Sequence, residues 1–219
     1  MTTLISVEGN IGSGKSTLLE NLRKYYENNK NVVFLKEPVD EWENIKDKFG
    51  NAMLEKFYSN QKRYSFSFQM MAFISRLVLL KDTIKQNKDA IIITERSLIT
   101  DKSVFAKMLY DMGNIEDVEY QIYVKWFEYF VSEFPISKII YVNCDPEICF
   151  NRINERSRIG ENEITLDYLN KCNEYHNNMI VSFCKKSDVM LLELDGNTNL
   201  KQNNDQLEVW LQEINSFIF

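Results

Sequence analysis

The chain has 219 residues, 44% of them hydrophobic, and a formal net charge of −6. This apolar content excludes a disordered chain, and the length suits one domain spanning residues 1–219. Residues 188–219 hold six acids and one lysine, which leaves a net charge of only −1 for the other 187 residues. Neither part offers the extended basic face that binding to nucleic acid requires.

The apolar runs and the cysteines bear on where the protein works. The apolar runs, such as Leu77–Leu80, are far shorter than the roughly 20 residues of a membrane-spanning helix. The chain enters its first apolar run by Leu4, so we expect no signal or transit segment before it. The four cysteines form no Cys-x-x-Cys pair, and only His176 could join them as a metal ligand. We therefore expect free thiols in a cytoplasmic protein that binds no membrane.

Short apolar runs rich in β-branched residues recur along the chain and predict strands. The five runs are Leu4–Val7, Val32–Leu35, Ala90–Thr94, Lys138–Val142 and Val189–Leu194. Longer stretches with helical spacing separate them, and strands that alternate with helices indicate a parallel sheet covered on both faces. The predicted fold class is α/β, with a five-stranded parallel sheet whose ligand lies beyond the carboxyl ends of the strands.

A phosphate-binding motif follows the first predicted strand. Residues 9–16 read GNIGSGKS and match G-x-x-x-x-G-K-[ST], and the amphipathic stretch Leu18–Tyr26 comes next. In such a loop the backbone N–H groups bind phosphate, Lys15 reaches the β- and γ-phosphates, and the Ser16 hydroxyl takes Mg²⁺. Glycines are expected here because side chains would block the close approach of phosphate. The motif predicts a nucleoside triphosphate site, which Glu8, at the end of the strand, would orient.

Two large classes of P-loop protein fit the sequence poorly. Switch GTPases read guanine with Asn-Lys-x-Asp, which Asn87–Ala90 misses by one residue. A motor or pump ATPase would end an apolar strand in an aspartate, whereas the third predicted strand runs into Glu95–Ser97. Asp145 beyond the fourth strand is the one competitor, and we expect it to cap the helix that opens at Pro146.

The stretch Phe66–Ile84 has helical spacing with two distinct faces. One face predicts a core stripe made of Phe66, Met70, Phe73, Leu77, Leu80 and Ile84. Another face carries Gln69, Ala72 and Arg76, which are either solvated or turned toward a polar ligand.

Two arginines, Arg152 and Arg156, lie four residues apart on a later predicted helix. Like charges at this spacing repel each other. Either an anion lies between them, or Glu155 neutralises one of them.

Four segments together resemble one family. They are GNIGSGKST at 9–17, EPVDEW at 37–42, ERS at 95–97 and PEICFNRINERSRIGENEITLDY at 146–168. In this order and spacing they resemble the deoxynucleoside kinases, in particular the deoxycytidine/deoxyguanosine kinase branch, from Leu4 to about Asn197. The resemblance implies a P-loop kinase fold with a short arginine-bearing lid at about residues 152–163. It also implies transfer of the γ-phosphoryl group of ATP to the 5′-hydroxyl of a deoxynucleoside, with Mg²⁺, in nucleotide salvage.

The resemblance also assigns roles around ATP. Glu37 would accept the proton of the 5′-hydroxyl, a contribution of roughly 10²–10⁴-fold. Arg96 would bridge the 5′-oxygen and the phosphoryl group and Lys15 would complete the catalytic set, while Glu95 would help Ser16 to hold Mg²⁺. The ATP-binding residues would be Gly9, Asn10, Ile11, Gly12, Ser13, Gly14, Lys15, Ser16, Thr17, Arg152, Arg156, Arg158, Asp195, Gly196 and Asn197.

A second set of residues would bind the nucleoside. The resemblance makes Gln69 the reader of a base edge and places the Arg76–Asp101 pair at the far end of the base. Asp101 would accept from an exocyclic amine while Arg76 holds it ionised, which favours cytosine or purine deoxynucleosides over thymidine. The full set would be Ile11, Glu37, Trp42, Phe57, Tyr58, Phe68, Gln69, Ala72, Arg76, Arg96, Asp101, Phe105 and Glu161, with Tyr58 and Glu161 on the 3′-hydroxyl.

Two departures from the family pattern stand out. Phe57 replaces a frequent methionine and would narrow the cleft, and Gly160 replaces one of two paired acids and would loosen the lid.

The family further implies a homodimer packed through helices, including Ile115–Phe134 or Ser103–Met112, and inhibition by a deoxynucleoside triphosphate. Two alternatives stay open. One is a nucleoside monophosphate kinase of the same fold, although we identify no additional arginine cluster for an acceptor phosphate outside the lid. The other is a regulatory nucleotide-binding protein that performs no transfer.

Overall fold

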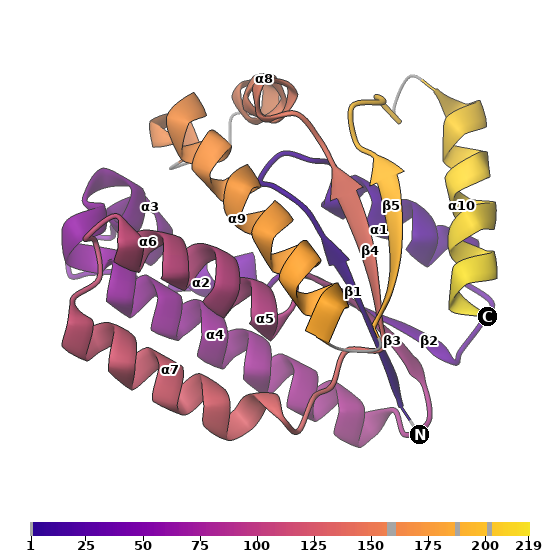
Figure 1. Cartoon of the computed structure of the whole chain (residues 1–219), viewed down its shortest axis with the longest axis horizontal. Helices are drawn as coiled ribbons and strands as arrows, with labels where there is room; N and C mark the ends of the chain where they lie inside the picture. The colour runs from indigo at the N-terminus through magenta and orange to yellow at the C-terminus, as the bar shows by residue number, and fades with distance from the viewer. Residues whose placement is uncertain (1, 157–160, 187–188, 201–202) are drawn as a thin grey trace.

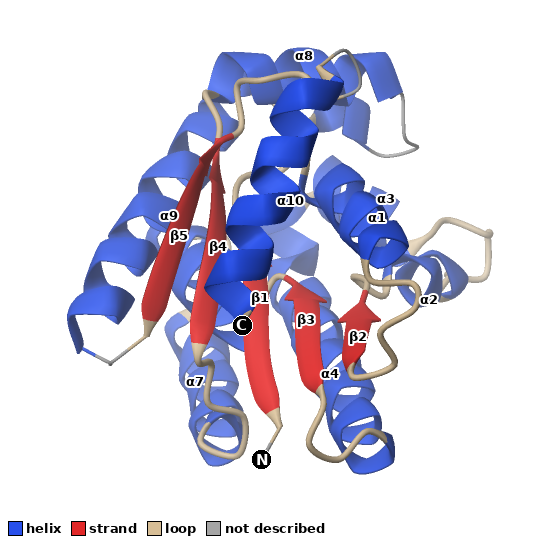
Figure 2. Ribbon diagram, turned by 90° about the vertical axis from the view of Figure 1, so that its right-hand side faces the viewer, coloured by secondary structure: helices blue, strands red, loops and turns tan. Residues whose placement is uncertain are grey.

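A parallel sheet forms the centre of the computed structural model, which describes residues 2–156, 161–186, 189–200 and 203–219. The strands of the described residues are β1 (Thr3–Glu8), β2 (Val32–Leu35), β3 (Ile91–Glu95), β4 (Lys138–Asn143) and β5 (Met190–Asp195). They are hydrogen-bonded in the order β2-β3-β1-β4-β5 with every pair parallel, as Figure 2 shows. The α/β prediction is confirmed, and each strand boundary lies within one residue of its expected place.

Helices cover both faces of the sheet, because the central strands are buried on both sides. On one face lie α1 (Lys15–Tyr25) and α10 (Asn204–Ile218) (Figure 2). Their apolar stripes, which include Leu22 and Ile214, pack against Ile5 and Ile140 of the central strands. This face anchors the beginning of α1, and therefore the loop that precedes it.

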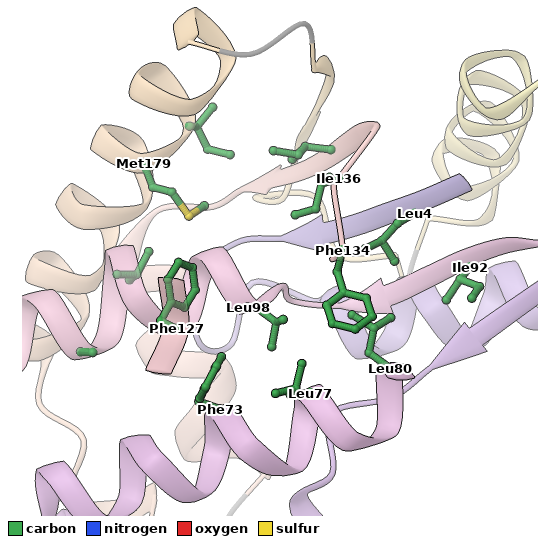
Figure 3. Packing of buried hydrophobic residues seen from close by; sticks show 14 of the residues in the cluster. Leu4, Phe73, Leu77, Leu80, Ile92, Leu98, Phe127, Phe134, Ile136 and Met179 are labelled. Carbon is green, nitrogen blue, oxygen red and sulfur yellow. The ribbon is translucent and has the colours of Figure 1, made fainter. Parts of the chain in front are cut away.

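The opposite face carries α4 (Gln61–Gln86), α7 (Asp117–Val131) and α9 (Leu166–Lys186) (Figure 1). Figure 3 shows Phe73 and Leu77 of α4 packed with Phe127 of α7 and Leu98 in one apolar cluster. The predicted core stripe of α4 is confirmed, since Phe73, Leu77 and Leu80 are buried and Phe66, Met70 and Ile84 pack against them.

A continuous helical segment from residue 98 to residue 111 packs against the helices α4, α7 and α9 of this face. Its parts are α5 (Leu98–Thr100), η1 (Asp101–Ala106) and α6 (Lys107–Asp111). In η1 the helix widens to a π-turn, so that the N–H of Lys107 donates to the carbonyl oxygen of Lys102, five residues back. Such wide turns often occur at functional sites, and this one carries Asp101 and Phe105.

Shorter elements lie beyond the carboxyl ends of the strands, where the ligand is expected. They are α2 (Val39–Asn44), α3 (Met53–Ser59), α8 (Pro146–Arg156) and η2 (Glu161–Glu163). Figure 1 shows α8 beyond the end of β4. All four cysteines are free thiols, as expected. Among the described residues, no helix has the length and apolar character needed to span a membrane.

Candidate active site

The loop between β1 and α1 needs its glycines for backbone reasons. Gly9, Gly12 and Gly14 have φ angles of 145°, 82° and 100°, in the region that favours glycine. A Cβ on Gly9 would lie 2.5 Å from the carbonyl oxygen of Val142, and one on Gly12 would lie 2.6 Å from that of Cys149. Two of these glycines therefore also make room for β4 and α8, a requirement separate from the close approach of phosphate.

Lys15 is the buried cation of this loop. Its Nζ donates to the carbonyl oxygen of Asn10 at 2.6 Å and to Oγ of Ser13 at 3.4 Å. Burial, followed by the charge of Arg96, lowers the pKa of Lys15 to about 7, although Glu95 acts in the opposite direction. A bound polyphosphate would stabilise the charged form.

Only part of the loop faces the cavity that lies beside it. Residues 11–17 line this cavity, whereas Gly9 and Asn10 do not. The Asn10 side chain is buried, accepts from the N–H of Ile11 at 2.8 Å and donates to the carbonyl oxygen of Leu169 on α9 at 3.0 Å. Asn10 thus joins the loop to α9 through its side chain, so a contact with ATP would have to come from its backbone.

The expected metal ligands meet at the start of α1. The Ser16 hydroxyl donates to Oε1 of Glu95, at the end of β3, over 2.6 Å. A hydroxyl and a carboxylate are hard oxygen donors, which suit Mg²⁺, an ion that also keeps water and substrate phosphates as ligands. The donor set therefore fits the predicted ion.

Glu8 points elsewhere. Among the described residues its hydrogen-bond partner is the Thr100 hydroxyl, which donates to Oε2 at 2.5 Å. Our expectation that Glu8 orients the phosphate loop is wrong, because its carboxylate joins β1 to α5.

Glu37 lies between two guanidinium groups. Its Oε1 accepts from Nη2 of Arg76 at 2.9 Å and lies 3.5 Å from Nε of Arg96. Burial acts to raise the pKa of Glu37, but Arg76 and Arg96 together outweigh it and hold that pKa below its ordinary value. Glu37 is therefore ionised at neutral pH, in a side chain that keeps 20% of its surface exposed toward the cavity it lines.

Arg76 connects Glu37 to Asp101, so the predicted pair is part of a larger network. Its Nε donates to Oδ2 of Asp101 at 2.9 Å, and its Nη1 donates to the carbonyl oxygen of Glu95 at 2.7 Å. Burial raises the pKa of Asp101 to about 6 even though Arg76 acts to lower it. Arg76 therefore keeps Asp101 mostly, but not fully, in its charged form at neutral pH. The face of α4 that carries Gln69, Ala72 and Arg76 is buried, so it is not solvated, which was one of the two alternatives for it.

Arg96 is buried and has an unusual backbone. Its φ of 63° is left-handed, a conformation that costs a residue other than glycine roughly 1–2 kcal/mol. Its Nη1 donates to the carbonyl oxygen of Gly9 at 2.8 Å and lies 3.1 Å from Nε2 of His176, while the guanidinium carbon lies 4.8 Å from the ring centroid of Phe105. Arg96 is not the surface ion pair that its position after Glu95 would also allow.

Aromatic side chains wall the rest of the cavity, which has a volume of about 430 Å³. Phe57 and Phe68 stack with ring centroids 4.4 Å apart, and Trp42 meets Phe68 edge-on at 5.6 Å. Nε1 of Trp42 donates to Oγ of Ser75 at 2.9 Å, which fixes the plane of the indole. The further lining residues that we predicted for the nucleoside are Ile11, Tyr58, Gln69, Ala72, Phe105 and Glu161.

Gln69 is a polar side chain of this wall. It is buried, yet its amide makes no hydrogen bond with any described residue. Both its donor and its acceptor are therefore available to a ligand in the cavity.

The arginines of α8 are paired in ways that the sequence did not indicate. Arg156 makes two hydrogen bonds to Glu161, of 2.6 and 2.5 Å, rather than one to Glu155. Arg152 donates to the carbonyl oxygens of residues 196, 197 and 198 at 2.7, 3.2 and 3.2 Å. Arg158 and Gly160 lie outside the described residues.

In the loop after β5, the residues that line the cavity come further along the chain than the three we predicted. Asp195, Gly196 and Asn197 do not line it, whereas residues 198–200 and Trp210 do. Asn197 instead exchanges two hydrogen bonds with Asp145, of 2.8 and 3.1 Å. The Asp145 carboxylate therefore holds this loop, while its carbonyl oxygen accepts the N–H of Cys149 in the first turn of α8.

Sequence reasoning missed two residues close to the charged network. Tyr168 of α9 lines the cavity, and His176, two turns later on the same helix, contacts Arg96. Tyr168 ends a segment that carried the family resemblance, so that segment could have indicated it. His176 had no comparable signal, because a single histidine on a helix is more often a core residue than a functional one.

Comparisons with known proteins all match this chain to deoxynucleoside kinases. The family model described as deoxynucleoside kinase matches residues 5–219. The probable deoxycytidine kinase of fowlpox virus (strain NVSL) is 36% identical over 218 residues, which covers 98% of this chain and 87% of the viral protein. Human deoxycytidine kinase is 31% identical over 240 residues (98% and 90% of the two chains). The mitochondrial deoxyguanosine kinase of Xenopus laevis is 30% identical over 225 residues (91% and 83%).

Proposed function

The chain belongs to the deoxynucleoside kinase family, and from this premise we propose that it transfers the γ-phosphoryl group of ATP to the 5′-hydroxyl of a deoxynucleoside in nucleotide salvage. One observation carries the proposal. The ionised carboxylate of Glu37 lines one cavity together with the phosphate loop and a set of aromatic side chains. A nucleoside bound against the aromatic side chains could bring a hydroxyl group to both this carboxylate and a triphosphate held by the loop.

The residues of this chain would divide the chemistry as follows. Glu37 accepts a hydrogen bond from the 5′-hydroxyl and takes its proton as the 5′-oxygen bonds to the γ-phosphorus, while the bond from that phosphorus to the bridging oxygen breaks and ADP leaves. Arg96 and Lys15 place positive charge beside the transferring group, where a loose transition state spreads its negative charge. Ser16 and Glu95 would hold Mg²⁺, which supplies further positive charge to the phosphates.

We infer a preference for cytosine or purine deoxynucleosides over thymidine. Gln69 offers an unused donor and acceptor, and Asp101 offers a carboxylate in the lining of the same cavity. An exocyclic amine suits that carboxylate, whereas the methyl and carbonyl groups of thymine do not. Replacing both Arg76 and Asp101, as R76M/D101A, should raise kcat/KM for thymidine relative to deoxycytidine; no gain would place the pair outside base recognition.

The primary test is a substrate survey. Phosphorylation rates with ATP and Mg²⁺ are measured for the four deoxynucleosides, the four ribonucleosides and the deoxynucleoside monophosphates. Deoxynucleosides should be consumed fastest. Consumption of monophosphates alone would replace the proposal with a monophosphate kinase, and binding of ATP without any transfer would replace it with a regulator.

The role of Glu37 is tested by Glu37→Gln, which keeps the size of the side chain and removes its basicity. We expect kcat to fall roughly 10²–10⁴-fold while ATP still binds. Glu41→Gln is the matched control. Glu41 is exposed on α2 and does not line the cavity, so this substitution makes the same chemical change away from the site. Equal activity in the two variants would remove Glu37 from the reaction.

A homodimer packed through α4 and α7 is the assembly we propose. These helices pack against each other through Phe73 and Phe127, and their outer surfaces expose Ile74 and Val78 on α4 and Val118, Ile122, Trp126 and Tyr129 on α7. Covering so many apolar side chains in solution favours association. Trp126→Lys should convert the dimer into a monomer in light scattering; a monomeric unchanged protein would contradict this assembly.

Two properties complete the proposal. A deoxynucleoside triphosphate that is an end product could place its base in the aromatic half of the cavity and its phosphates in the loop, and would then inhibit the enzyme in competition with both substrates. We also propose that the protein acts in the cytoplasm, where thiols such as those of its four free cysteines stay reduced.

A further inference from the structure

His176 is the chain's single histidine, and it is completely buried in the middle of α9. Its Nδ1 lies 2.7 Å from the carbonyl oxygen of Cys172, and its Nε2 lies 3.1 Å from Nη1 of Arg96. A carbonyl oxygen only accepts, so Nδ1 must carry the proton. A guanidinium only donates, so Nε2 must present its lone pair to Arg96.

The surroundings hold the imidazole in this neutral form. Burial, followed by the charge of Arg96, keeps the pKa of His176 well below its ordinary value. The ring also meets Phe105 edge-on, with centroids 5.9 Å apart, and the same phenyl ring lies under the guanidinium of Arg96. His176 and Phe105 therefore confine Arg96 from two directions.

The contact sets the orientation of the guanidinium group. Nη1 is shared between Gly9 and His176, which turns Nε toward Glu37 at 3.5 Å. Nη2 of Arg96 has no hydrogen-bond partner among the described residues and belongs to a side chain that lines the cavity. The protein thus holds Nη1 and directs Nε toward Glu37, whereas Nη2 is left for a ligand.

We propose that His176 is a positioning residue for phosphoryl transfer, which holds Arg96 by accepting a hydrogen bond at Nε2 so that Arg96 faces both Glu37 and the transferring group. This inference rests on the proposed kinase function. Since the charge that Arg96 meets develops during transfer, misplacing its guanidinium should lower kcat and leave substrate binding nearly unchanged.

The geometry can be tested without any activity. The chain has one histidine, so ¹⁵N NMR of histidine-labelled protein at pH 7.5 reports a single imidazole. We expect the neutral tautomer protonated at Nδ1. A ring protonated at Nε2, or at both nitrogens, would overturn the proposal.

The role is tested by a pair of variants. His176→Gln keeps an acceptor near the position of Nε2, whereas His176→Leu fills the space without one. We expect kcat to fall about 10- to 100-fold in H176L with both KM values within about twofold of the unchanged protein, and H176Q to recover most of that loss. Ile180→Ala is the control, because Ile180 is buried one turn later on α9 in the apolar core; it should lower Tm without lowering kcat.

Each outcome has one meaning. Unchanged kcat in H176L, or equal losses of kcat in H176L and H176Q, would overturn the positioning role. If H176L does not fold, the NMR measurement still decides the geometry. Absence of nucleoside phosphorylation by the unchanged protein would reject the proposed function, and the tautomer would still report on the contact with Arg96.

Discussion

The hydrogen bonds of Arg76 allow a quantitative prediction about the charged network that lines the cavity. Its guanidinium is buried and donates to Asp101, Glu37 and the carbonyl oxygen of Glu95. Arg76→Met keeps an unbranched side chain of similar length, removes the cation that pairs with Asp101, and leaves Glu37 with Arg96 alone. Removing one partner of a buried ion pair costs about 3–5 kcal/mol, and we expect R76M to lose that much free energy of unfolding at neutral pH.

The partner substitution should cost less. In Asp101→Ala, Arg76 keeps Glu37 and a carbonyl oxygen as acceptors, so the loss should be about 1–3 kcal/mol. In the double variant R76M/D101A the orphaned Asp101 carboxylate is gone, and its loss should fall short of the sum of the single losses by about 2 kcal/mol or more.

The pKa of Asp101 determines how the stability lost in R76M should change with pH. Burial raises the pKa of Asp101 to about 6 in the folded protein, above its unfolded value, so its protonated form favours folding and this stability is lost as pH rises from about 4 through 6. Without Arg76 the folded pKa rises further and the loss continues above pH 6. The deficit of R76M should therefore be smaller at pH 5.5 than at pH 8.

Urea unfolding followed by circular dichroism at both pH values measures these free energies. Losses that simply add in the double variant, together with a deficit in R76M that does not change with pH, would contradict the ion pair between Arg76 and Asp101 as the source of this stability. Such a result would mean that water or a neighbouring group replaces Arg76 as the partner of Asp101.

Two residues of the phosphate loop give further tests. In Gly9→Ala, the Cβ would lie 2.5 Å from the carbonyl oxygen of Val142 at a φ of 145°, so the free energy of unfolding should fall by roughly 2–4 kcal/mol in urea titrations. Gly50→Ala, with φ of 90° and nothing within 4 Å, should show the φ cost alone, and equal losses would argue against the clash. Lys15, with its pKa of about 7, must be charged to bind polyphosphate, so binding takes up a proton. The affinity for a non-hydrolysable MgATP analogue should fall about tenfold for each pH unit above 7 in calorimetry. Lys15→Arg, always charged, should lack this dependence, and a pH-independent affinity in the unchanged protein would contradict the pKa.

What the sequence predicts well is local in the chain. The strands are continuous β-branched runs because both of their faces are buried, so a segment such as Val32–Leu35 is recognisable without its neighbours. The phosphate loop is recognisable for the same reason, since its glycines, Lys15 and Ser16 lie within eight residues. The core stripe of α4 follows from a single helical period.

What the sequence does not predict depends on partners that are distant along the chain. Arg96 meets His176 across 80 residues, and Arg152 turns to the loop after β5 across 44. The π-turn at Asp101 has no periodicity that distinguishes it from an ordinary helix. Arg156 has acids on both sides, and only the folded chain shows that it chooses Glu161 over Glu155.

The network around Glu37 also indicates how the enzyme would accelerate its reaction. Arg76 and Arg96 lower the pKa of Glu37, which makes it a weaker base toward a hydroxyl group. In a loose transition state the hydroxyl loses its proton late, so an accurately placed weak base is sufficient. Removing Arg76 should raise the pKa of Glu37 and nevertheless lower kcat, because the position of the carboxylate matters more than its basicity. An increase in kcat for R76M with deoxycytidine would mean that the basicity of Glu37 matters more than its position.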